Sequence, residues 1–184
     1  MVNNYKLIPM AEQHISTLYN WNVKEEHFEW YSCRPLELCK SFDEYANKIL
    51  KATSEGKQRI YILTNKDDYN IPLGKITLFD FNPRNHSAEF GYYLPIENRL
   101  QGLGSIMVGQ FIKNSFEDDK LSLNKIYATT SSNNLASIRL LEKFGLKLDG
   151  RLREHYWINE NKYDQLVYSI LKSEWTYRIE VYEI

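Results

Sequence analysis

The sequence predicts one α/β domain, in which a meander of strands is followed by a strand–helix–strand–helix unit. The chain has 184 residues, which is enough for one hydrophobic core and too few for two ordinary domains. Apolar residues alternate with polar ones in some segments and recur at helical spacing in others. No repeat, low-complexity tract or flexible linker separates these segments. We therefore expect one domain over residues 1–184, with its core at about 5–175 and a tail at 176–184.

The N-terminal half predicts one strand, two helices and then three strands. Pro9 ends the first strand, and Ile15 and Leu18 share one face of the helix that follows. The Ser41 hydroxyl and the Glu44 carboxylate form a predicted capping box at the start of the second helix. Alternation then predicts three strands, separated by the turn sequences KDDYN and PRNH. These elements are predicted at residues 5–8, 15–23, 41–53, 59–64, 73–81 and 87–94.

The C-terminal half predicts a helix, a strand, a second helix and a closing hairpin. Ile106, Phe111 and Ile112 are core candidates on the first of these helices, and Gly145 stops the second. The last two strands are joined by a turn at residues 159–161. These elements are predicted at residues 102–117, 125–130, 134–144, 147–157 and 162–171.

The bulk composition gives no reason to expect a nucleic acid or a membrane as a partner. The chain carries 23 basic and 24 acidic side chains, so its net charge is close to zero. Cys33 and Cys39 match no common zinc or redox spacing, and we expect ordinary thiols and no metal site. The N-terminus lacks the pattern of a signal peptide, and no apolar run is long enough to span a membrane. These features predict a cytoplasmic protein, either a monomer or a homodimer.

The stretch RLQGLGS, residues 99–105, places a glycine-spaced turn between a predicted strand and a predicted helix. The first amides of a helix have no partner within it, and the helix dipole adds partial positive charge there. Gly102 and Gly104 would let an anion such as a pyrophosphate approach this backbone closely. A triphosphate site would need a following lysine and Ser/Thr, and a dinucleotide fold would place G-x-G-x-x-G early in a parallel unit. Taken alone, the turn also fits an ordinary helix start.

A second motif follows the strand IYATT: the segment NLASIRLLEKFGL, residues 134–146. Together the two motifs resemble the GNAT superfamily of N-acetyltransferases, which pair an R/Q-x-x-G-x-G/A turn with a later N-x-x-S-x-x-x-x-x-K-x-G-F segment. The only departure from the second motif is Leu146, where the family usually has phenylalanine. The C-terminal part resembles the ribosomal-protein alanine and serine N-acetyltransferases, and the stretch NHSAEF resembles bacterial spermidine N-acetyltransferases. The resemblance extends over about residues 5–175.

The resemblance implies a fold, a cofactor and the residues that hold it. The fold would be a mixed, mostly antiparallel twisted sheet of about seven strands, flanked by about four helices. Two strands would splay apart at a bulge, and the first of them would pair with the pantetheine arm of acetyl-CoA. Amides of the glycine turn would hold the pyrophosphate. The implied cofactor-binding residues are Tyr92, Tyr93, Leu94, Arg99, Leu100, Gln101, Gly102, Leu103, Gly104, Ser105, Asn134, Ser137 and Lys143.

Acetyl transfer to an amine requires a group that takes a proton from the amine. Glu89 is the first candidate for this base, because its strand leads to the glycine turn. Alternatively, Glu89 pairs with an arginine for structural reasons. Glu154 and His155, on a late strand, are rival candidates, although His155 also fits an ordinary structural histidine.

The leaving thiolate benefits from a proton donor, and the carbonyl must be polarised. Ser137 is the candidate donor, as in the ribosomal-protein branch that the chain resembles. Many relatives carry a tyrosine in this helix, but Leu141 takes its place here. The Ser137 hydroxyl could instead bond to the preceding helical turn, and several tyrosines, Tyr92 among them, stay possible. The amide of Tyr93 or Leu94 would polarise the carbonyl.

The acceptor is expected to be a primary amine that attacks directly while both substrates are bound. Its site should lie in the least regular segments, because the regular elements are committed to the core and the cofactor. The acceptor-binding candidates are Glu26, Glu29, Trp30, Tyr31, Tyr156 and Trp157. The glutamates suit a protein N-terminus or a polyamine, although they also fit a solvated helix face, and the tryptophans suit an amino-sugar nucleotide. A non-catalytic acyl-CoA-binding module on the same fold is a further alternative.

Overall fold

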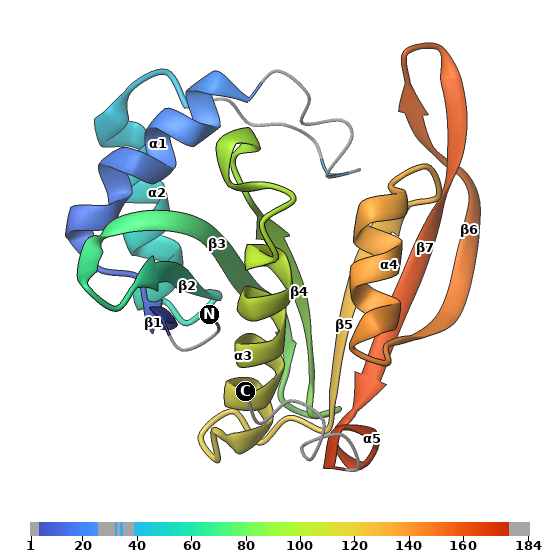
Figure 1. Cartoon of the computed structure of the whole chain (residues 1–184). Coiled ribbons are helices and arrows are strands. Elements are labelled where there is room, and N and C mark those ends of the chain that lie inside the picture. The colour runs from blue at the N-terminus through green and yellow to red at the C-terminus, as the bar shows by residue number, and fades with distance from the viewer. Residues whose placement is uncertain (1–3, 26–31, 33, 35–38, 177–184) are drawn as a thin grey trace.

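The computed structural model describes residues 4–25, 32, 34 and 39–176, and it shows one α/β domain (Figure 1). Seven strands form one mixed sheet in the order β1-β2-β3-β4-β5-β7-β6, and only the β4–β5 pair among them is parallel. The predicted fold class is therefore confirmed. The strands are β1 (Tyr5–Pro9), β2 (Gln58–Asn65), β3 (Asp68–Asn82), β4 (Ser87–Tyr93), β5 (Lys125–Ser131), β6 (Lys147–Ile158) and β7 (Asn161–Leu171).

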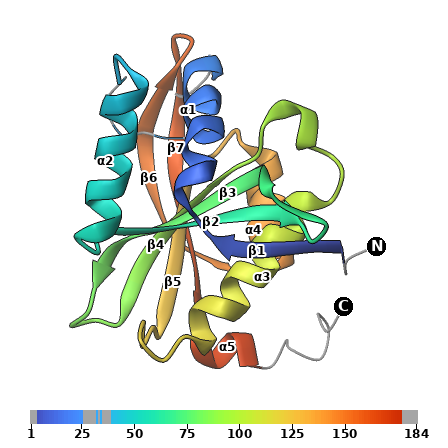
Figure 2. The same ribbon diagram turned by 90° about the vertical axis from the view of Figure 1, so that its left-hand side faces the viewer.

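The sheet is strongly twisted, since β1, β2 and β3 run across the direction of β5, β6 and β7 (Figure 2). The described part of the chain contains the four predicted helices and a short fifth helix at its end. The fifth helix has only five residues, too few for a periodic pattern in the sequence. The α-helices are α1 (Ile15–Lys24), α2 (Phe42–Ser54), α3 (Leu103–Glu117), α4 (Leu135–Lys143) and α5 (Lys172–Thr176), and the 3₁₀ helices are η2 (Glu12–His14) and η4 (Ile96–Asn98).

Ser41 caps the start of helix α2, as the sequence predicts, but the capping box is only half formed. The Ser41 hydroxyl accepts a hydrogen bond from the Glu44 amide at 3.2 Å. The Glu44 carboxylate accepts from the Lys40 amide at 2.8 Å, one residue before the expected donor. The side chain still satisfies a backbone donor at the helix start, so the local effect on α2 is the same.

The hairpin between β2 and β3 is tighter than predicted. The expected turn KDDYN is wrong at its last three residues, because β3 begins at Asp68. The two strands stay paired through register shifts near Thr64, which lies opposite Pro72. A proline is tolerated in a strand at such an irregularity, where no ladder hydrogen bond is required from its nitrogen.

Two hydrophobic clusters lie on opposite faces of the sheet. On one face, Ile60 and Ile62 of β2 pack with Leu18 of α1 and Ile49 of α2. On the other face, the larger cluster joins strand residues to helices α3 and α4, and Phe111 of α3 lies within it. Successive residues of one strand therefore point to opposite faces of the sheet and pack against different pairs of helices. This division decides on which side of the sheet each functional side chain lies.

Strands β4 and β5 pair over only three residues at one end. Their parallel ladder runs from Ser87 and Lys125 to Glu89 and Tyr127, and then it stops. Beyond this point β4 is paired only with β3, and β5 only with β7. Figure 1 shows the two strands diverging from their common end. We call these edges, residues 90–93 and 128–131, the β4–β5 splay. The bulge expected beside it lies on β3, where the register shifts between Phe79 and Asn82.

Candidate active site

The glycine turn forms a backbone site at the start of α3. Gly102 is the N-cap, with a φ of 79° and no side-chain cap, and Leu100 also has a positive φ of 61°. Within the described residues, the amides of Leu103 and Gly104 have no hydrogen-bond partner. The Ser105 amide donates a hydrogen bond to the Gly102 carbonyl at 3.0 Å. The turn therefore presents unpaired amides at the positive end of the α3 dipole. This arrangement suits an anion.

Gly104 is also required by close packing around the turn. A Cβ atom at this position would lie 3.3 Å from Leu94 Cδ1 and 3.4 Å from Leu140 Cδ2. Those neighbours belong to the segment after β4 and to helix α4. Glycine thus allows α3 to begin between them, and a larger residue would disturb packing as well as the turn.

Lys143, near the end of α4, reaches the same turn from the other side. Its Nζ donates a hydrogen bond to Ser105 Oγ at 2.9 Å. This contact places a positive charge beside the unpaired amides. Leu146, the one departure from the family motif, is 3% exposed and packs within the larger core cluster, so leucine serves there as an apolar side chain.

The Arg99 side chain is held by contacts with other residues of the protein. Its Nε donates to the Leu94 carbonyl at 2.9 Å, and one guanidinium nitrogen lies 3.8 Å from Glu25 Oε2. Its backbone amide donates to the Ile96 carbonyl at 3.2 Å. Arg99 therefore ties the glycine turn to the end of β4 and to the residue after α1. Its geometry is that of a group that positions the turn.

Tyr92 and Ser137 form a hydroxyl pair across the β4–β5 splay. The Tyr92 hydroxyl lies 2.6 Å from Ser137 Oγ, and either atom could be the donor. Asn134, the N-cap of α4, accepts from the Ser137 amide at 3.1 Å and so fixes the start of this helix. Burial raises the pKa of Tyr92 to about 12, although the hydrogen bond with Ser137 acts in the opposite direction. The phenol is therefore protonated at neutral pH.

Glu89 is the last residue of β4 that pairs with β5, and it is buried. Its Oε2 lies 2.7 Å from a guanidinium nitrogen of Arg34, and its Oε1 accepts from Thr129 Oγ1 at 2.9 Å. The Arg34 guanidinium also lies 4.9 Å from the centre of the Phe79 ring. The alternative role of Glu89, an ion pair with an arginine, is thus present in the structure. The same contacts hold the carboxylate at the start of the splay.

The two catalytic candidates lie on opposite faces of the sheet. Glu89 contacts Thr129 and Arg34 on the face of α1 and α2, whereas Tyr92 packs with the cluster under α3 and α4. Strand alternation produces this arrangement, because residues three apart on a strand point to opposite sides. Ser137 and Glu89 thus approach the splay from different faces.

The splay also carries polar groups without partners. The free edge of β4 beyond Glu89 exposes backbone groups that a paired strand would satisfy. At the end of β5, Ser131 Oγ and Asn133 Oδ1 are buried and have no hydrogen-bond partner within the described residues. Buried polar atoms are rarely left unpaired. The free edge of β4 could pair with the polar backbone of a ligand.

The rival bases lie farther along the β6–β7 hairpin. Glu154 is exposed and forms an ion pair with Lys162 at 2.8 Å, and its amide donates to Asp164 Oδ1 at 2.8 Å. The His155 ring lies 6.5 Å from the ring of Tyr156, its neighbour in the chain. Both residues therefore have local structural contacts, and the described contacts connect neither of them to Glu89 or Ser137. Leu141, where many relatives carry a tyrosine, is fully buried.

Only part of the predicted acceptor site falls within the described residues. Tyr156 is 3% exposed, whereas Trp157 is 69% exposed and has Lys162 Nζ at 5.6 Å from its ring centre. The face of Trp157 thus already carries a cation of the protein, which disfavours stacking of a cationic acceptor there. The other four candidates, Glu26, Glu29, Trp30 and Tyr31, lie outside the described residues.

Sequence reasoning missed the partners of the predicted residues. Arg34 and Thr129, which hold Glu89, are 55 and 40 positions away from it in the chain. Strand alternation around Glu89 could have indicated a cross-strand neighbour on β5, but no local signal points to Arg34. Within the described residues, no helix is long and apolar enough to cross a membrane, and no group of three His, Cys, Asp or Glu side chains is placed to hold a metal ion.

Comparison with known proteins identifies the family. The family model described as "Acetyltransferase (GNAT) domain" matches residues 5–147. The spermidine N(1)-acetyltransferase of Vibrio cholerae is 26% identical over 163 residues, which are 89% of this chain and 90% of that protein. YdaF of Bacillus subtilis, provisionally named a ribosomal N-acetyltransferase, is 29% identical over 102 residues, 55% of each chain. The structure of V. cholerae spermidine N-acetyltransferase with CoA and spermine has a TM-score of 0.83 at 23% identity, covering 95% of this chain and 99% of that one.

The chain belongs to the GNAT family of acetyltransferases, because the family model covers most of its length. It is an N-acetyltransferase, and the family's donor, acetyl-CoA, is its cofactor. The family, the enzyme class and the cofactor predicted from the sequence are therefore confirmed. The glycine turn and the β4–β5 splay are the features of this structure that suit such a cofactor.

Proposed function

We propose that this N-acetyltransferase acetylates a primary amine by direct attack at the β4–β5 splay, with both substrates bound together. The observation that carries this proposal is the placement of Glu89 and the Tyr92–Ser137 pair. They reach the splay from opposite faces of the sheet. A direct transfer needs a proton acceptor on one side of the reacting carbon and a proton donor on the other.

The described residues fit acetyl-CoA, which supplies the acetyl group as a thioester. Amides in the segment 101–105 would bind the pyrophosphate, and Lys143 would add positive charge beside them. The unpaired edge of β4 at residues 92–93 would pair with the amide-rich pantetheine arm. Asn134 would orient the start of α4 and Arg99 the glycine turn.

Glu89 would take a proton from the attacking amine, directly or through water. Thr129 and Arg34 would hold the carboxylate in place while it does so. Ser137 would donate its hydroxyl proton to the leaving sulfur, and the Tyr92 phenol would replace that proton through the 2.6 Å contact. The amide of Tyr93 or Leu94 would polarise the carbonyl. Each proton taken or given is thereby assigned to a side chain.

Turnover of acetyl-CoA with a panel of amines, followed by thiol release, tests this proposal. We expect release that depends on the amine and an acetylated product that mass spectrometry identifies. Two candidate acceptors are supported by relatives: a polyamine, by the V. cholerae enzyme that matches nine-tenths of the chain, and a ribosomal acceptor, by YdaF. Binding of acetyl-CoA without transfer to any amine would contradict the proposal and favour a non-catalytic acyl-CoA-binding module.

The oligomeric state expected from the sequence, a monomer or a homodimer, is also a proposal. Sedimentation velocity with and without acetyl-CoA would test it. A larger assembly that persists on dilution would contradict it.

A further inference from the structure

Arg34 places a guanidinium group on the carboxylate that is the proposed base. One of its terminal nitrogens lies 2.7 Å from Glu89 Oε2, and its central carbon lies 4.9 Å from the centre of the Phe79 ring. Phe79 is the residue of β3 that pairs in register with Glu89. The Arg34 side chain is 59% exposed, but the ion pair and the ring contact hold its cationic end at the β4–β5 splay.

The Glu89 carboxylate can still accept a hydrogen bond from an acceptor amine. Its Oε1 accepts from Thr129 Oγ1, and its Oε2 accepts from Arg34. A carboxylate offers about four lone-pair positions in all. An amine that donates to this carboxylate would have its nitrogen about 3–6 Å from the guanidinium, because both groups are bonded to one carboxyl group. The reacting nitrogen would therefore be close to Glu89 and to Arg34 at the same time.

Tyr127 and Asp80 are the ionisable side chains that the described contacts place beside this ion pair. Tyr127 pairs in register with Glu89, and its hydroxyl donates to Asp80 Oδ2 at 2.5 Å. Partial burial and this hydrogen bond raise the pKa of Tyr127, so the phenol is neutral at pH 7. Asp80 is exposed, and water screens its charge. The charge of Glu89 also raises the pKa of Tyr127 whereas that of Arg34 lowers it, so the two charges oppose each other at a neighbouring group.

The ion pair affects which form of an amine the site favours. A buried carboxylate alone would attract an ammonium group and keep it charged. With Arg34 beside Glu89, repulsion between the guanidinium and the ammonium offsets this attraction, whereas a neutral amine meets no such repulsion. An α-amino group is less basic than an alkylamine such as a lysine side chain. Its neutral fraction at pH 7 is therefore larger by about two orders of magnitude.

We propose that Arg34 is a specificity-determining residue, which selects weakly basic primary amines such as α-amino groups over alkylammonium and polyammonium acceptors. This proposal rests on the proposed function, and it disfavours a polyamine as the acceptor. Each further ammonium group of a polyamine adds to the repulsion from Arg34. Glu89 keeps its proposed role as the base, because an amine that attacks the thioester still has to lose a proton.

Glycinamide and isobutylamine test this selection, because they have nearly the same shape and size but differ in basicity. We expect kcat/KM at pH 7 for glycinamide to exceed the values for isobutylamine and for spermidine by about tenfold or more. The excess over isobutylamine should shrink toward about pH 10, where isobutylamine becomes largely neutral. Better turnover of isobutylamine or spermidine than of glycinamide at pH 7 would overturn the proposal.

Arg34→Gln removes the guanidinium charge, and Arg34→Lys keeps a cation in its place. The matched control is Arg84→Gln, which removes an exposed arginine from the turn between β3 and β4. We expect Arg34→Gln to lower the kcat/KM ratio of glycinamide to isobutylamine by about three- to tenfold, the effect of one partly screened charge. Arg34→Lys and Arg84→Gln should keep the ratio of the wild type. The KM for isobutylamine should fall in Arg34→Gln, and the KM for acetyl-CoA should stay the same.

The outcomes separate a role in specificity from a role in structure. If Arg34 only holds the carboxylate in place, Arg34→Gln lowers kcat/KM for both amines equally and leaves their ratio unchanged, which overturns the proposal. A ratio that falls equally in Arg34→Lys overturns it too, because the charge is then not the cause. If the wild-type protein acetylates no amine at all, the proposed function fails and this proposal fails with it. Turnover of amines with a ratio that Arg34 does not control overturns this proposal alone.

Discussion

The Tyr92 hydroxyl on β4 lies 2.6 Å from Ser137 Oγ on α4. This contact bridges two elements whose strands have already separated, since β4 and β5 are unpaired beyond Glu89. The serine is held by the start of its helix, and the phenol by its burial. The pair is therefore fixed at the splay, where we propose that the thioester of acetyl-CoA binds.

Removal of either hydroxyl should slow acetyl transfer. We expect Tyr92→Phe and Ser137→Ala each to lower kcat by about 10- to 100-fold, which is at or below the usual range for general acid catalysis because water can replace a donor in part. The KM for acetyl-CoA should change little, because the turn that we propose to bind the pyrophosphate is untouched. Steady-state kinetics measures both constants.

Tyr69→Phe is a suitable control for this pair, because it removes a phenol at a half-exposed position on the β2–β3 hairpin. We expect it to retain full activity. A double variant of Tyr92 and Ser137 should be no slower than the worse single variant if the two act as one unit. Full rates in both single variants would show that another group protonates the sulfur.

The role of Glu89 can be separated from its structural ion pair by a pH profile. Glu89→Gln should depress kcat/KM most at low pH, where the amine needs help to lose its proton, and less at high pH. Thermal unfolding of the same variant reports the loss of the contact with Arg34. Glu117→Gln, at the exposed end of α3, is the control. A defect of equal size at every pH, in step with lower stability, would assign Glu89 to structure alone.

Lys143 should contribute to cofactor affinity through its charge. Lys143→Gln removes the cation that lies beside the unpaired amides of the turn, with its Nζ at 2.9 Å from Ser105 Oγ. We expect about a three- to tenfold weaker CoA affinity by calorimetry, a difference that shrinks at high salt. Lys113→Gln on the exposed face of α3 should bind CoA normally. An unchanged affinity for Lys143→Gln at low salt would exclude a contact with the phosphates.

Local signals in the sequence were sufficient to predict most elements of the fold. The start of α3 follows from Gly102, which adopts a left-handed φ of 79°, and the start of α2 follows from the Ser41 cap. By contrast, the β2–β3 turn was misplaced because Asp68 and Asn70 are common in turns, whereas pairing with β2 extends the strand through them. Tertiary pairing decided that boundary.

The site was only partly predictable, because its contacts join distant positions. The glycine turn and the Asn134 motif are contiguous and were recognised. The contact of Glu89 with Arg34 spans 55 positions, and no spacing rule reports it. Lys75 alternates with apolar neighbours and has the pattern of a solvent-facing residue, since a strand's period does not say which face a helix covers. Helices α1 and α2 cover that face and leave the lysine only partly exposed.

The partial burial of Lys75 has a measurable effect on stability. Its pKa is about 8 in the folded chain, against an ordinary value of 10.5, so the folded state holds this proton less tightly than the unfolded state. Below pH 8 the lysine is charged in both states, and the full penalty applies, on the order of 3 kcal/mol at most. Lys75→Met should therefore increase the free energy of unfolding at pH 7.

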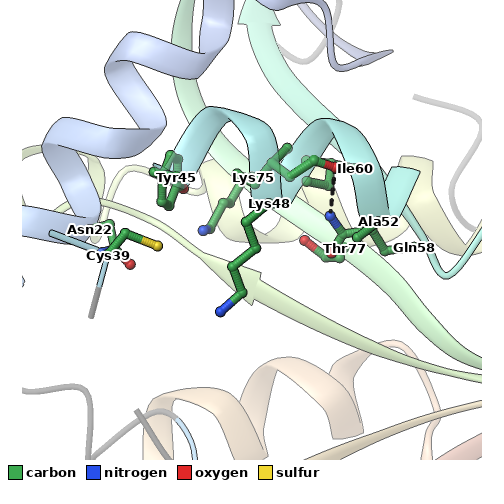
Figure 3. A pocket seen from close by; sticks show the side chains of 10 residues that line it. Asn22, Cys39, Tyr45, Lys48, Ala52, Gln58, Ile60, Lys75 and Thr77 are labelled. Atoms are coloured by element: carbon green, nitrogen blue, oxygen red, sulfur yellow. Dashed lines mark hydrogen bonds between the residues drawn. The ribbon is translucent and has the colours of Figure 1, made fainter. Parts of the chain in front are cut away.

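The stabilisation by Lys75→Met should shrink as the pH rises from 8 to 10.5. In this window the folded wild-type chain releases the proton first, so the unfolded state binds more protons and wild-type stability rises. A cavity on the α1/α2 face of the sheet is lined by Lys75 together with Cys39, Tyr45 and Lys48 (Figure 3). The last three residues are present in both proteins, so the difference in free energy of unfolding between wild type and variant isolates Lys75. Urea unfolding at pH 7, 9 and 10.5 measures it. A difference that stays constant with pH, or a variant less stable than wild type at pH 7, would show that Lys75 is not a buried cation.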